Sequence, residues 1–121
     1  MTTKLNWSSY EPLTKSKVDK VTESGGVYRL ARGGETYGVF YVGKTENLKS
    51  RLNDHLDDKD DDCIKTRVAK GNCYFKYAEL TGDKNRSGAE RTLYDHFSDK
   101  NGGPPCNKQK SSEDPLDINI K

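Results

Sequence analysis

Long apolar runs are missing from this sequence of 121 residues. Hydrophobic residues make up 31% of the chain and charged residues 33%, so we expect a small core and a strongly polar surface. No stretch has the roughly 20 apolar residues that a membrane span needs, or the shorter apolar run of a signal peptide. We therefore expect a single soluble domain in the cytoplasm, without a membrane partner.

Cysteine is scarce and is not arranged as a metal site or a disulfide framework. The three cysteines, Cys63, Cys73 and Cys106, are odd in number and widely spaced, and no two of them form a CxxC pair. Such spacing offers no zinc site and frames no set of disulfides. We expect all three to be reduced and to serve as small packing residues.

Charge of one sign is also lacking, because the formal net charge is only +2 at pH 7. Basic residues nevertheless gather at 44–51, 65–70, 84–91 and 108–110, and the negative charge is concentrated at 57–62. Basic clusters around an acidic patch fit a phosphate-binding face, while a solvated surface of mixed charge explains the pattern equally well. The aspartates themselves indicate a loop or the first turn of a helix. A metal-binding cluster there is the less favoured alternative.

Two short β-branched and aromatic runs predict a hairpin. Residues 27–30 and 39–42 are the expected strands, and a Gly-Gly pair between them is a turn signal. Strand alternation places Tyr41 on the same face as Val39. Pairing in a hairpin would then set the Tyr41 phenol beside that of Tyr28, at the strand ends.

A helix is expected to follow the hairpin, from about residue 47 to residue 57. Its buried stripe consists of Leu48, Leu52 and Leu56, which recur every four residues. Arg51 and His55 are also four residues apart, so they stand together along the edge of that stripe. Two tyrosines, a guanidinium and an imidazole thus converge where the sheet meets the helix. This is the geometry of a site, but periodicity alone does not name its chemistry.

The chain on either side of this unit predicts further elements. They are a short helix after Thr14, a helix around Ile64 and Val68, a half-buried strand over 73–80 and, after a polar loop at 81–88, a helix that ends near 98. Trp7 and Tyr10 are expected to anchor an N-terminal arm on the core, with base stacking as the alternative for Trp7. The expected divisions are an arm with a short helix at 1–24, a core at 25–107 and a tail at 108–121 that either adds an edge strand or lies loose.

The ordered motifs of this chain resemble those of the GIY-YIG nuclease family. They are Gly26-Val27-Tyr28, Tyr41-Val42-Gly43-Lys44, Asn47-Leu48, Arg51 with His55, Ala89-Glu90 and Pro104-Pro105-Cys106-Asn107. One tripeptide alone is a weak signal, whereas six elements in the right order over about residues 25–107 are a specific one. Three departures are small: valine replaces isoleucine in both signature tripeptides, the loop between the tyrosines is slightly long, and a Gly-Gly insertion precedes Asn107.

The resemblance implies a site that cleaves phosphodiester bonds. Its catalytic residues would be Tyr28, Tyr41, Arg51, His55 and Glu90, and its substrate-binding residues would be Gly43, Lys44 and Asn107. The resemblance further makes Glu90 the sole protein ligand of a divalent cation, Mg2+ or Mn2+. Tyr28 would be the general base or the group that positions water, with Tyr41 aiding orientation. Arg51 would offset the charge that develops on the phosphate.

Residue spacing alone leaves other readings open. Glu90 is in register with an apolar stripe that begins at Leu93, so an inward carboxylate would need a cation; a capping box from Ser87 to Glu90 is the competing explanation. His55 is a rival general base, because imidazole titrates near neutral pH, or else an ordinary surface histidine. The two tyrosines would ordinarily pack in a sheet, since a phenol is a poor base unless a nearby cation favours its ionised form.

The function that the resemblance implies is metal-dependent hydrolysis of DNA, with RNA as an open alternative substrate. The implied fold is α/β of the α+β type, with a three-stranded antiparallel sheet flanked by helices. The sequence has no zinc finger, helix-turn-helix or long basic tail, so specificity would come from DNA structure or from a protein partner. A monomer and a homodimer fit equally well. Two other functions stay open: a catalytically idle nucleic-acid-binding module, and a structural protein whose tyrosines only pack.

Overall fold

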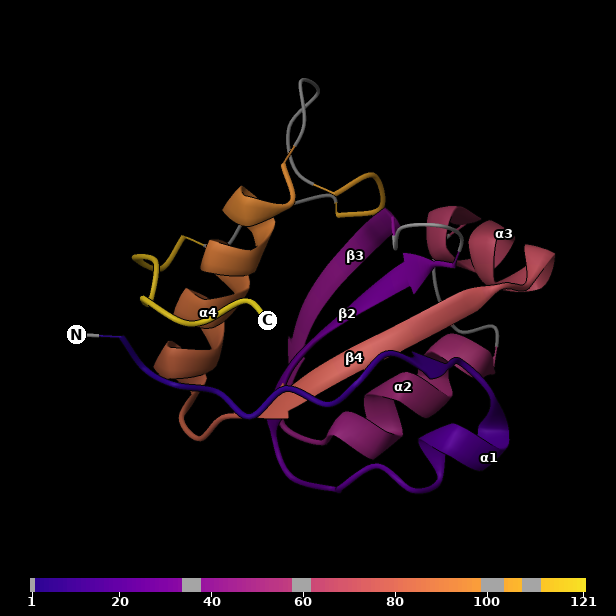
Figure 1. The fold of residues 1–121 in the computed structure, drawn as a ribbon, viewed down its shortest axis with the longest axis horizontal. Coiled ribbons are helices and arrows are strands. Elements are labelled where there is room, and N and C mark those ends of the chain that lie inside the picture. Colours follow the sequence, from indigo (N-terminus) through magenta and orange to yellow (C-terminus); the bar gives the residue numbers. More distant parts are fainter. Residues whose placement is uncertain (1, 34–37, 58–61, 99–103, 108–111) are drawn as a thin grey trace.

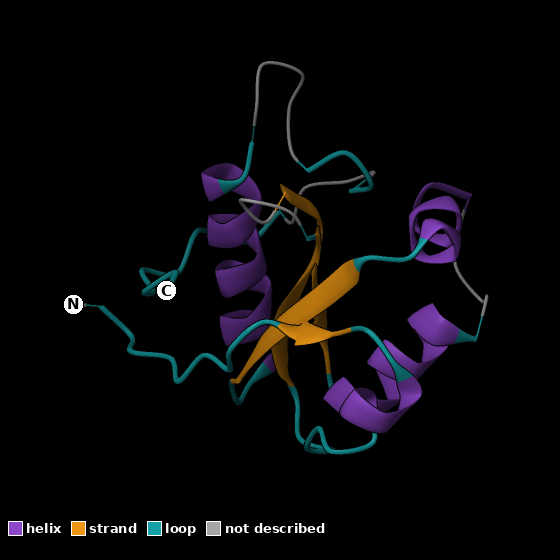
Figure 2. Cartoon of the chain, turned by 45° about the vertical axis from the view of Figure 1, so that its right-hand side comes forward, coloured by secondary structure: helices purple, strands orange, loops and turns teal. Residues whose placement is uncertain are grey.

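A computed structural model describes the chain at residues 2–33, 38–57, 62–98, 104–107 and 112–121 (Figure 1). Its helices and strands are β1 (Glu11–Pro12), α1 (Lys15–Val18), β2 (Gly26–Arg32), β3 (Gly38–Thr45), α2 (Leu48–Leu56), α3 (Asp62–Lys70), β4 (Cys73–Glu79) and α4 (Asp83–His96). The strands form one antiparallel sheet in the order β1-β4-β2-β3. Helices α1, α2 and α3 lie on one side of this sheet and α4 lies on the other (Figure 2).

The central strand β2 supplies side chains to an apolar core on each side of the sheet. Its residues from Gly26 to Ala31 are buried, and alternate side chains point to opposite faces. The α2-side core includes Tyr28, Leu30, Leu48, Leu52 and Phe75. The α4-side core includes Val27, Val42, Ala78, Ala89 and Leu93. Because β2 is buried on both faces, it reads as a nearly continuous apolar run, which made this strand easy to predict.

The α+β class is confirmed, but the sheet has four strands and the expectation of three is wrong. The missed strand β1 has only two residues, and it pairs with β4 through Glu11 opposite Phe75 and Pro12 opposite Tyr74. Proline has no N–H to donate, which confines it to the edge of a sheet, where β1 lies. Two residues are too few to show alternation, so no periodic signal marks this strand.

Helix α4 begins at Asp83, inside the segment that was expected to be a polar loop. That expectation is wrong because Asp83 to Asn85 are exposed and carry no apolar side chain that would reveal the helical period. Gly82 occupies the N-cap position, and Ser87 lies well inside the helix. A capping box between Ser87 and Glu90 is therefore excluded, and Glu90 must have another partner.

The other predicted elements agree with the structure to within a few residues. Thr14 caps α1 and Asn47 caps α2, each with a side-chain oxygen that accepts a backbone N–H. The helix around Ile64 is α3 and the half-buried strand is β4.

A β-bulge in β3 changes which side chains share a face. Leu30 pairs with Tyr41 and Ala31 pairs with Val39, so Phe40 has no partner in β2. The extra residue shifts the alternation that follows it. Tyr41 packs against the α2-side core and Val39 against the α4-side core, so the expectation that they share a face is wrong. The bulge thereby turns the Tyr41 ring toward α2.

The N-terminal arm and the C-terminal tail pack together through a buried arginine. Arg29 is only 4% exposed, and its guanidinium carbon lies 4.9 Å from the centroid of the Trp7 ring. Its Nε donates to Tyr10 Oη at 2.9 Å, and its Nη1 donates to the carbonyl oxygen of Ile120 at 2.8 Å. The expected anchoring of the arm by Trp7 and Tyr10 is confirmed.

Several expected features lie outside the described residues. They are the turn at 34–37, the middle of the aspartate run at 58–61, the glycines at 102–103 and the start of the tail at 108–111. In the described part of the tail, Ile118 forms an isolated parallel bridge with Thr3 in place of an edge strand. None of the described helices is long and apolar enough to cross a membrane.

Candidate active site

A buried tyrosine–histidine pair lies between β2 and α2. Tyr28 Oη and His55 Nε2 share a hydrogen bond of 2.8 Å. Tyr28 is 0% exposed and His55 is 2% exposed, so neither side chain meets solvent in this structure. His55 comes two helical turns after Leu48 and projects from the same face of α2. The expected convergence of the two side chains is confirmed, and the reading of His55 as a surface histidine is excluded.

Tyr41 completes a cluster of three rings. Its ring centroid lies 6.1 Å from that of Tyr28 and 5.6 Å from that of His55. Unlike the other two side chains, Tyr41 is only partly buried. The three rings come from β2, β3 and α2, so the cluster forms only when the hairpin packs against the helix. Tyr41 is therefore the ring of the three that a substrate can reach.

Gly43 makes room for the Tyr28 phenol. The two residues are opposite each other in the register of β2 and β3. A Cβ atom at position 43 would lie 2.5 Å from both Cζ and Oη of Tyr28, far inside van der Waals contact. The close approach of the aromatic ring is therefore what requires glycine at this position.

Replacement of Gly43 by alanine is expected to destabilise the protein by about 1–3 kcal/mol, the usual cost of forcing an extra group into a filled core. It should also displace the Tyr28 phenol from His55 and thereby disturb the ring cluster. Gly38→Ala is the matched control, because Gly38 lies on the same strand and a Cβ there meets nothing within 4 Å. Urea denaturation of the two variants checks the prediction, and equal stabilities would contradict it.

Arg51 lies one helical turn before His55 on α2 and is partly buried. One helix therefore supplies both a guanidinium and an imidazole. The expected position of Arg51 beside the ring cluster stays a prediction. The expected contact of Arg51 with phosphate stays a prediction.

Glu90 of α4 is held at the outer edge of β3, which is an edge strand of the sheet. The backbone amide of Lys44 donates a hydrogen bond to the Glu90 carboxylate. Burial raises the pKa of Glu90 above the ordinary value for glutamate, and the Lys44 ammonium and amide offset only part of that rise. A desolvated carboxylate whose charge is incompletely compensated gains from the approach of a further cation.

The Lys44 side chain is fixed by Ser87, which was not among the predicted site residues. Lys44 Nζ donates to Ser87 Oγ at 2.7 Å, and Ser87 is only 8% exposed. Ser87 and Glu90 are three residues apart on α4 and share a face of that helix. The spacing that suggested a capping box was thus a real signal, but the hydroxyl binds a lysine across the fold.

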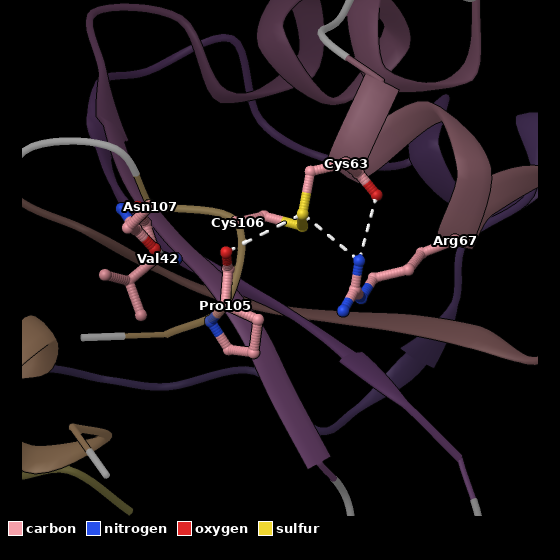
Figure 3. Close-up of a disulfide and its surroundings, with 6 residues drawn as sticks. All are labelled: Val42, Cys63, Arg67, Pro105, Cys106 and Asn107. Carbon is pink, nitrogen blue, oxygen red and sulfur yellow. Dashed lines mark hydrogen bonds between the residues drawn. A yellow bond between two sulfur atoms is a disulfide. The ribbon is translucent and has the colours of Figure 1, made fainter. Parts of the chain in front are cut away.

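Asn107 braces the outer edge of β3 (Figure 3). Its Oδ1 accepts a hydrogen bond from the Val42 amide at 2.9 Å, and its Nδ2 donates to the Val42 carbonyl oxygen at 2.9 Å. The side-chain amide thus pairs with Val42 as a neighbouring strand would. Val42 lies between Tyr41 and Gly43, so Asn107 stabilises the strand that carries the ring cluster. Its expected contact with substrate stays a prediction.

The fold and the order of these residues along the chain are those of one domain family. The sequence model of the GIY-YIG catalytic domain matches residues 24–102. The chain belongs to the GIY-YIG family. The match ends before Asn107, whose place in the site rests on its contact with Val42. No curated protein that was compared with this GIY-YIG chain matches it.

Solved structures of similar fold include the GIY-YIG N-terminal endonuclease domain of UvrC from Thermotoga maritima. The structure bound to magnesium as its catalytic divalent cation has 19% sequence identity and a TM-score of 0.57, and the match covers 69% of this chain and 88% of that chain. A point mutant bound to its catalytic divalent cation has 19% identity and a TM-score of 0.57, over 69% of this chain and 87% of that chain. At this identity the likeness establishes the fold.

Within the part of the chain that the structure describes, Glu90 is the carboxylate of the site whose environment suits a cation. Among the described residues, no group of three or more His, Cys, Asp or Glu side chains is placed to hold a metal ion. Mg2+ does not need such a group, because it keeps several waters and is bound through one or two carboxylates together with substrate phosphate. The incompletely compensated charge of Glu90 suits that arrangement. The residues present therefore fit a hydrated divalent ion.

Two of the three cysteines form a disulfide, so the expectation of three reduced cysteines is wrong. Cys63 at the start of α3 is bonded to Cys106, with a Cα–Cα distance of 5.5 Å and a sequence separation of 43 (Figure 3). Their spacing in the sequence carries no sign of this pairing, because only the fold brings α3 beside residues 104–107. Cys73 is free and buried, as expected.

Proposed function

We propose that this GIY-YIG chain is a divalent-metal-dependent endonuclease that hydrolyses phosphodiester bonds in DNA. The observation that carries the proposal is that one short stretch of β3 connects the ring cluster to the Glu90 carboxylate. Tyr41 packs on Tyr28 and His55, and the amide of Lys44, three residues later, holds the Glu90 carboxylate. A phenol, a cationic side chain and a carboxylate that suits a metal are thus fixed to one strand edge. That combination suits attack on a phosphate.

In the proposed reaction a water molecule attacks phosphorus, and Tyr41 positions this water and acts as its general base. The family resemblance alone favoured Tyr28 for this role, but Tyr28 is 0% exposed. We therefore assign Tyr28 and His55 a positioning role behind Tyr41. Their hydrogen bond fixes the rings against which Tyr41 packs.

Cationic groups would hold the scissile phosphate. The Arg51 guanidinium can bind two phosphate oxygens and offset the charge of the transition state, and Lys44 adds a second positive charge. Glu90 would hold Mg2+ or Mn2+, which when bound supplies Lewis-acid stabilisation of a phosphoryl oxygen and of the leaving oxygen. Because these residues come from α2, β3 and α4, the substrate would bind across the outer edge of β3.

The metal dependence is supported by the solved UvrC domains, which are bound to a catalytic divalent cation. DNA is the favoured substrate and RNA is the alternative. One such site hydrolyses one strand. Cleavage of both strands would require a homodimer, two successive nicks or a protein partner.

Nicking of supercoiled plasmid tests the proposal. We expect the protein to convert supercoiled plasmid to the open circular form with Mg2+ or Mn2+ and to have no activity with excess EDTA. Flap, junction and duplex oligonucleotides, each made as DNA and as RNA, would identify the preferred substrate. A Glu90→Ala protein purified in the same way controls for contaminating nucleases.

Cleavage that persists unchanged in Glu90→Ala would show that the activity does not come from this site. Salt-sensitive binding to DNA without any cleavage would instead support the idle nucleic-acid-binding module. Absence of both binding and cleavage would support a structural role.

A further inference from the structure

Residues 104–107, here called the edge segment, take the place of a strand beside β3. The amide of Cys106 donates to the Phe40 carbonyl oxygen at 2.8 Å. The Asn107 side chain pairs with the amide and the carbonyl of Val42. Tyr41, whose ring is partly exposed, lies between Phe40 and Val42. The edge segment therefore holds β3 on both sides of Tyr41.

The Cys63–Cys106 disulfide anchors the edge segment to α3, and its surroundings favour thiol exchange. Cys63 is partly exposed, whereas Cys106 is 2% exposed, so a reductant approaches the disulfide from the Cys63 side. Arg67 Nη1 donates to the Cys63 carbonyl oxygen at 3.3 Å and lies 3.1 Å from the Cys63 sulfur (Figure 3). A guanidinium at this distance stabilises a thiolate, and a stabilised thiolate makes a disulfide easier to reduce.

We propose that this disulfide positions Asn107 against β3, and that its reduction by a dithiol converts the nuclease site to a form of low activity. The inference rests on the proposed function, because it concerns the activity of that same site. It assigns a role in the site to Cys63, which lies on a helix that carries none of the other site residues.

The exchange proceeds in two steps that balance. A thiolate of the dithiol attacks the Cys63 sulfur, forms a mixed disulfide and releases Cys106 as a thiolate, which takes up a proton. The second thiol of the reductant then attacks the reductant's other sulfur, which is bonded to Cys63 in the mixed disulfide. This attack releases Cys63 as a thiolate beside Arg67. Two electrons and one proton pass to the protein in total, the second proton of the dithiol passes to solvent, and the dithiol becomes a cyclic disulfide.

Reduction leaves the edge segment attached to β3 by its partly buried hydrogen bonds and by the packing of the buried Cys106 side chain, which are weaker restraints than a covalent link. Without the covalent link to α3, Asn107 leaves Val42 more often. The neighbouring Tyr41 then loses its fixed orientation. Loss of a supporting contact of this kind commonly lowers activity by roughly 10–100-fold.

The test compares the oxidised protein with the protein reduced by dithiothreitol, both carrying Cys73→Ser. Cys73 Sγ donates to the Arg67 carbonyl oxygen at 3.3 Å, a bond that a serine hydroxyl retains, so this substitution removes the third thiol with little disturbance. We expect reduction to slow plasmid nicking about tenfold or more and reoxidation with diamide to restore it. Cys63→Ser and Cys106→Ser should each be slow whether or not dithiothreitol is present.

Hydrogen exchange provides a readout that does not depend on activity. The Val42 amide, which donates to Asn107, should exchange faster after reduction, while the amides of the central strand β2 stay protected. Asn107→Ala should slow nicking by the oxidised protein and leave little further loss on reduction, because both changes remove the same contact.

The outcomes separate the inference from the proposed function. If the oxidised protein does not cleave DNA, the proposed function fails, and unchanged exchange at Val42 would overturn the positioning role independently. If both redox forms cleave at the same rate, the inference is overturned and the proposed function stands. Loss of protection throughout β2 on reduction would also overturn it, because the disulfide would then be a general cross-link. A full additional loss on reduction of Asn107→Ala would exclude Asn107 as the residue that is positioned.

Discussion

Glu90→Gln is expected to reduce DNA cleavage by about three orders of magnitude or more, because the charge stabilisation supplied through a bound cation amounts to several kcal/mol. Glutamine has nearly the size of glutamate and can accept the hydrogen bond from the Lys44 amide, but it has no negative charge for the cation. Single-turnover cleavage at saturating Mg2+ measures the loss. A rate close to that of the unmodified protein would show that Glu90 is not the ligand.

The stability of Glu90→Gln is the matched control for that result. Burial raises the pKa of Glu90 in the folded state, so its stabilising contribution is present below the unfolded value and is lost as the pH rises through the folded value. At neutral pH without metal, the charge of Glu90 therefore works against folding. We expect the glutamine variant to melt at the same or a higher temperature. A lower melting temperature would mean that lost activity reflects damage to the fold.

The same pKa shift predicts how cleavage depends on pH. Activity should fall as the pH drops through the pKa of Glu90, and this acid limb should lie above the ordinary range of a glutamate. Protons and the cation compete for one carboxylate, so a higher Mg2+ concentration should move the limb to lower pH. Cleavage rates across a pH series at two Mg2+ concentrations check both statements. If the acid limb does not move with Mg2+ concentration, it reports the titration of a group other than Glu90.

Tyr41→Phe is expected to produce the second large effect, a loss of about 10²–10⁴ in the cleavage rate, which is the usual contribution of a general base. Tyr41 is partly exposed, so removal of its hydroxyl should change stability little. Tyr28→Phe removes the same hydroxyl from a buried residue. It leaves the buried His55 nitrogen without its 2.8 Å partner, and we expect a loss of about 1–3 kcal/mol in stability with a smaller loss of rate.

The two phenylalanine variants control for each other, because each lacks one oxygen from one ring of the same cluster. Cleavage rates and urea denaturation measured on both separate catalysis from stability. If Tyr28→Phe loses more activity than Tyr41→Phe, then Tyr28 acts on the water, and the site must open to expose it.

The sequence contains enough information for most of the fold and for the convergence of Tyr28, Tyr41 and His55. The apolar pattern of the sequence predicts long or doubly buried elements such as α2 and β2. The spacing of Arg51 and His55 correctly predicts that both lie on one helix. Even the burial of His55 had a signal, since its distance from Leu48 is two helical turns, the period of a core position. The predicted buried stripe, with a strict spacing of four residues, included Leu56 and left out His55. Leu56 is only partly buried.

The features that escaped prediction depend on contacts between distant parts of the chain. The disulfide joins residues separated by 43 positions, and no local pattern encodes such a pairing. The bulge at Phe40 leaves the composition of β3 unchanged and alters only which way its side chains point. Ser87 binds Lys44 across the fold, and a plausible local partner at Glu90 concealed this contact. The start of α4 was missed because its first residues are exposed and polar.

The contacts that arrange the site also cover an edge strand, so we expect them to limit aggregation. An edge strand with unpaired backbone groups is a template for strand addition by another molecule. In β3, the carbonyl of Phe40 and both backbone groups of Val42 are occupied by the edge segment, and the amide of Lys44 is occupied by Glu90. Any change that detaches the edge segment would therefore expose unpaired backbone groups of β3 and would also slow the proposed reaction. Solubility and activity should decline together in such variants, since both depend on the same few backbone groups.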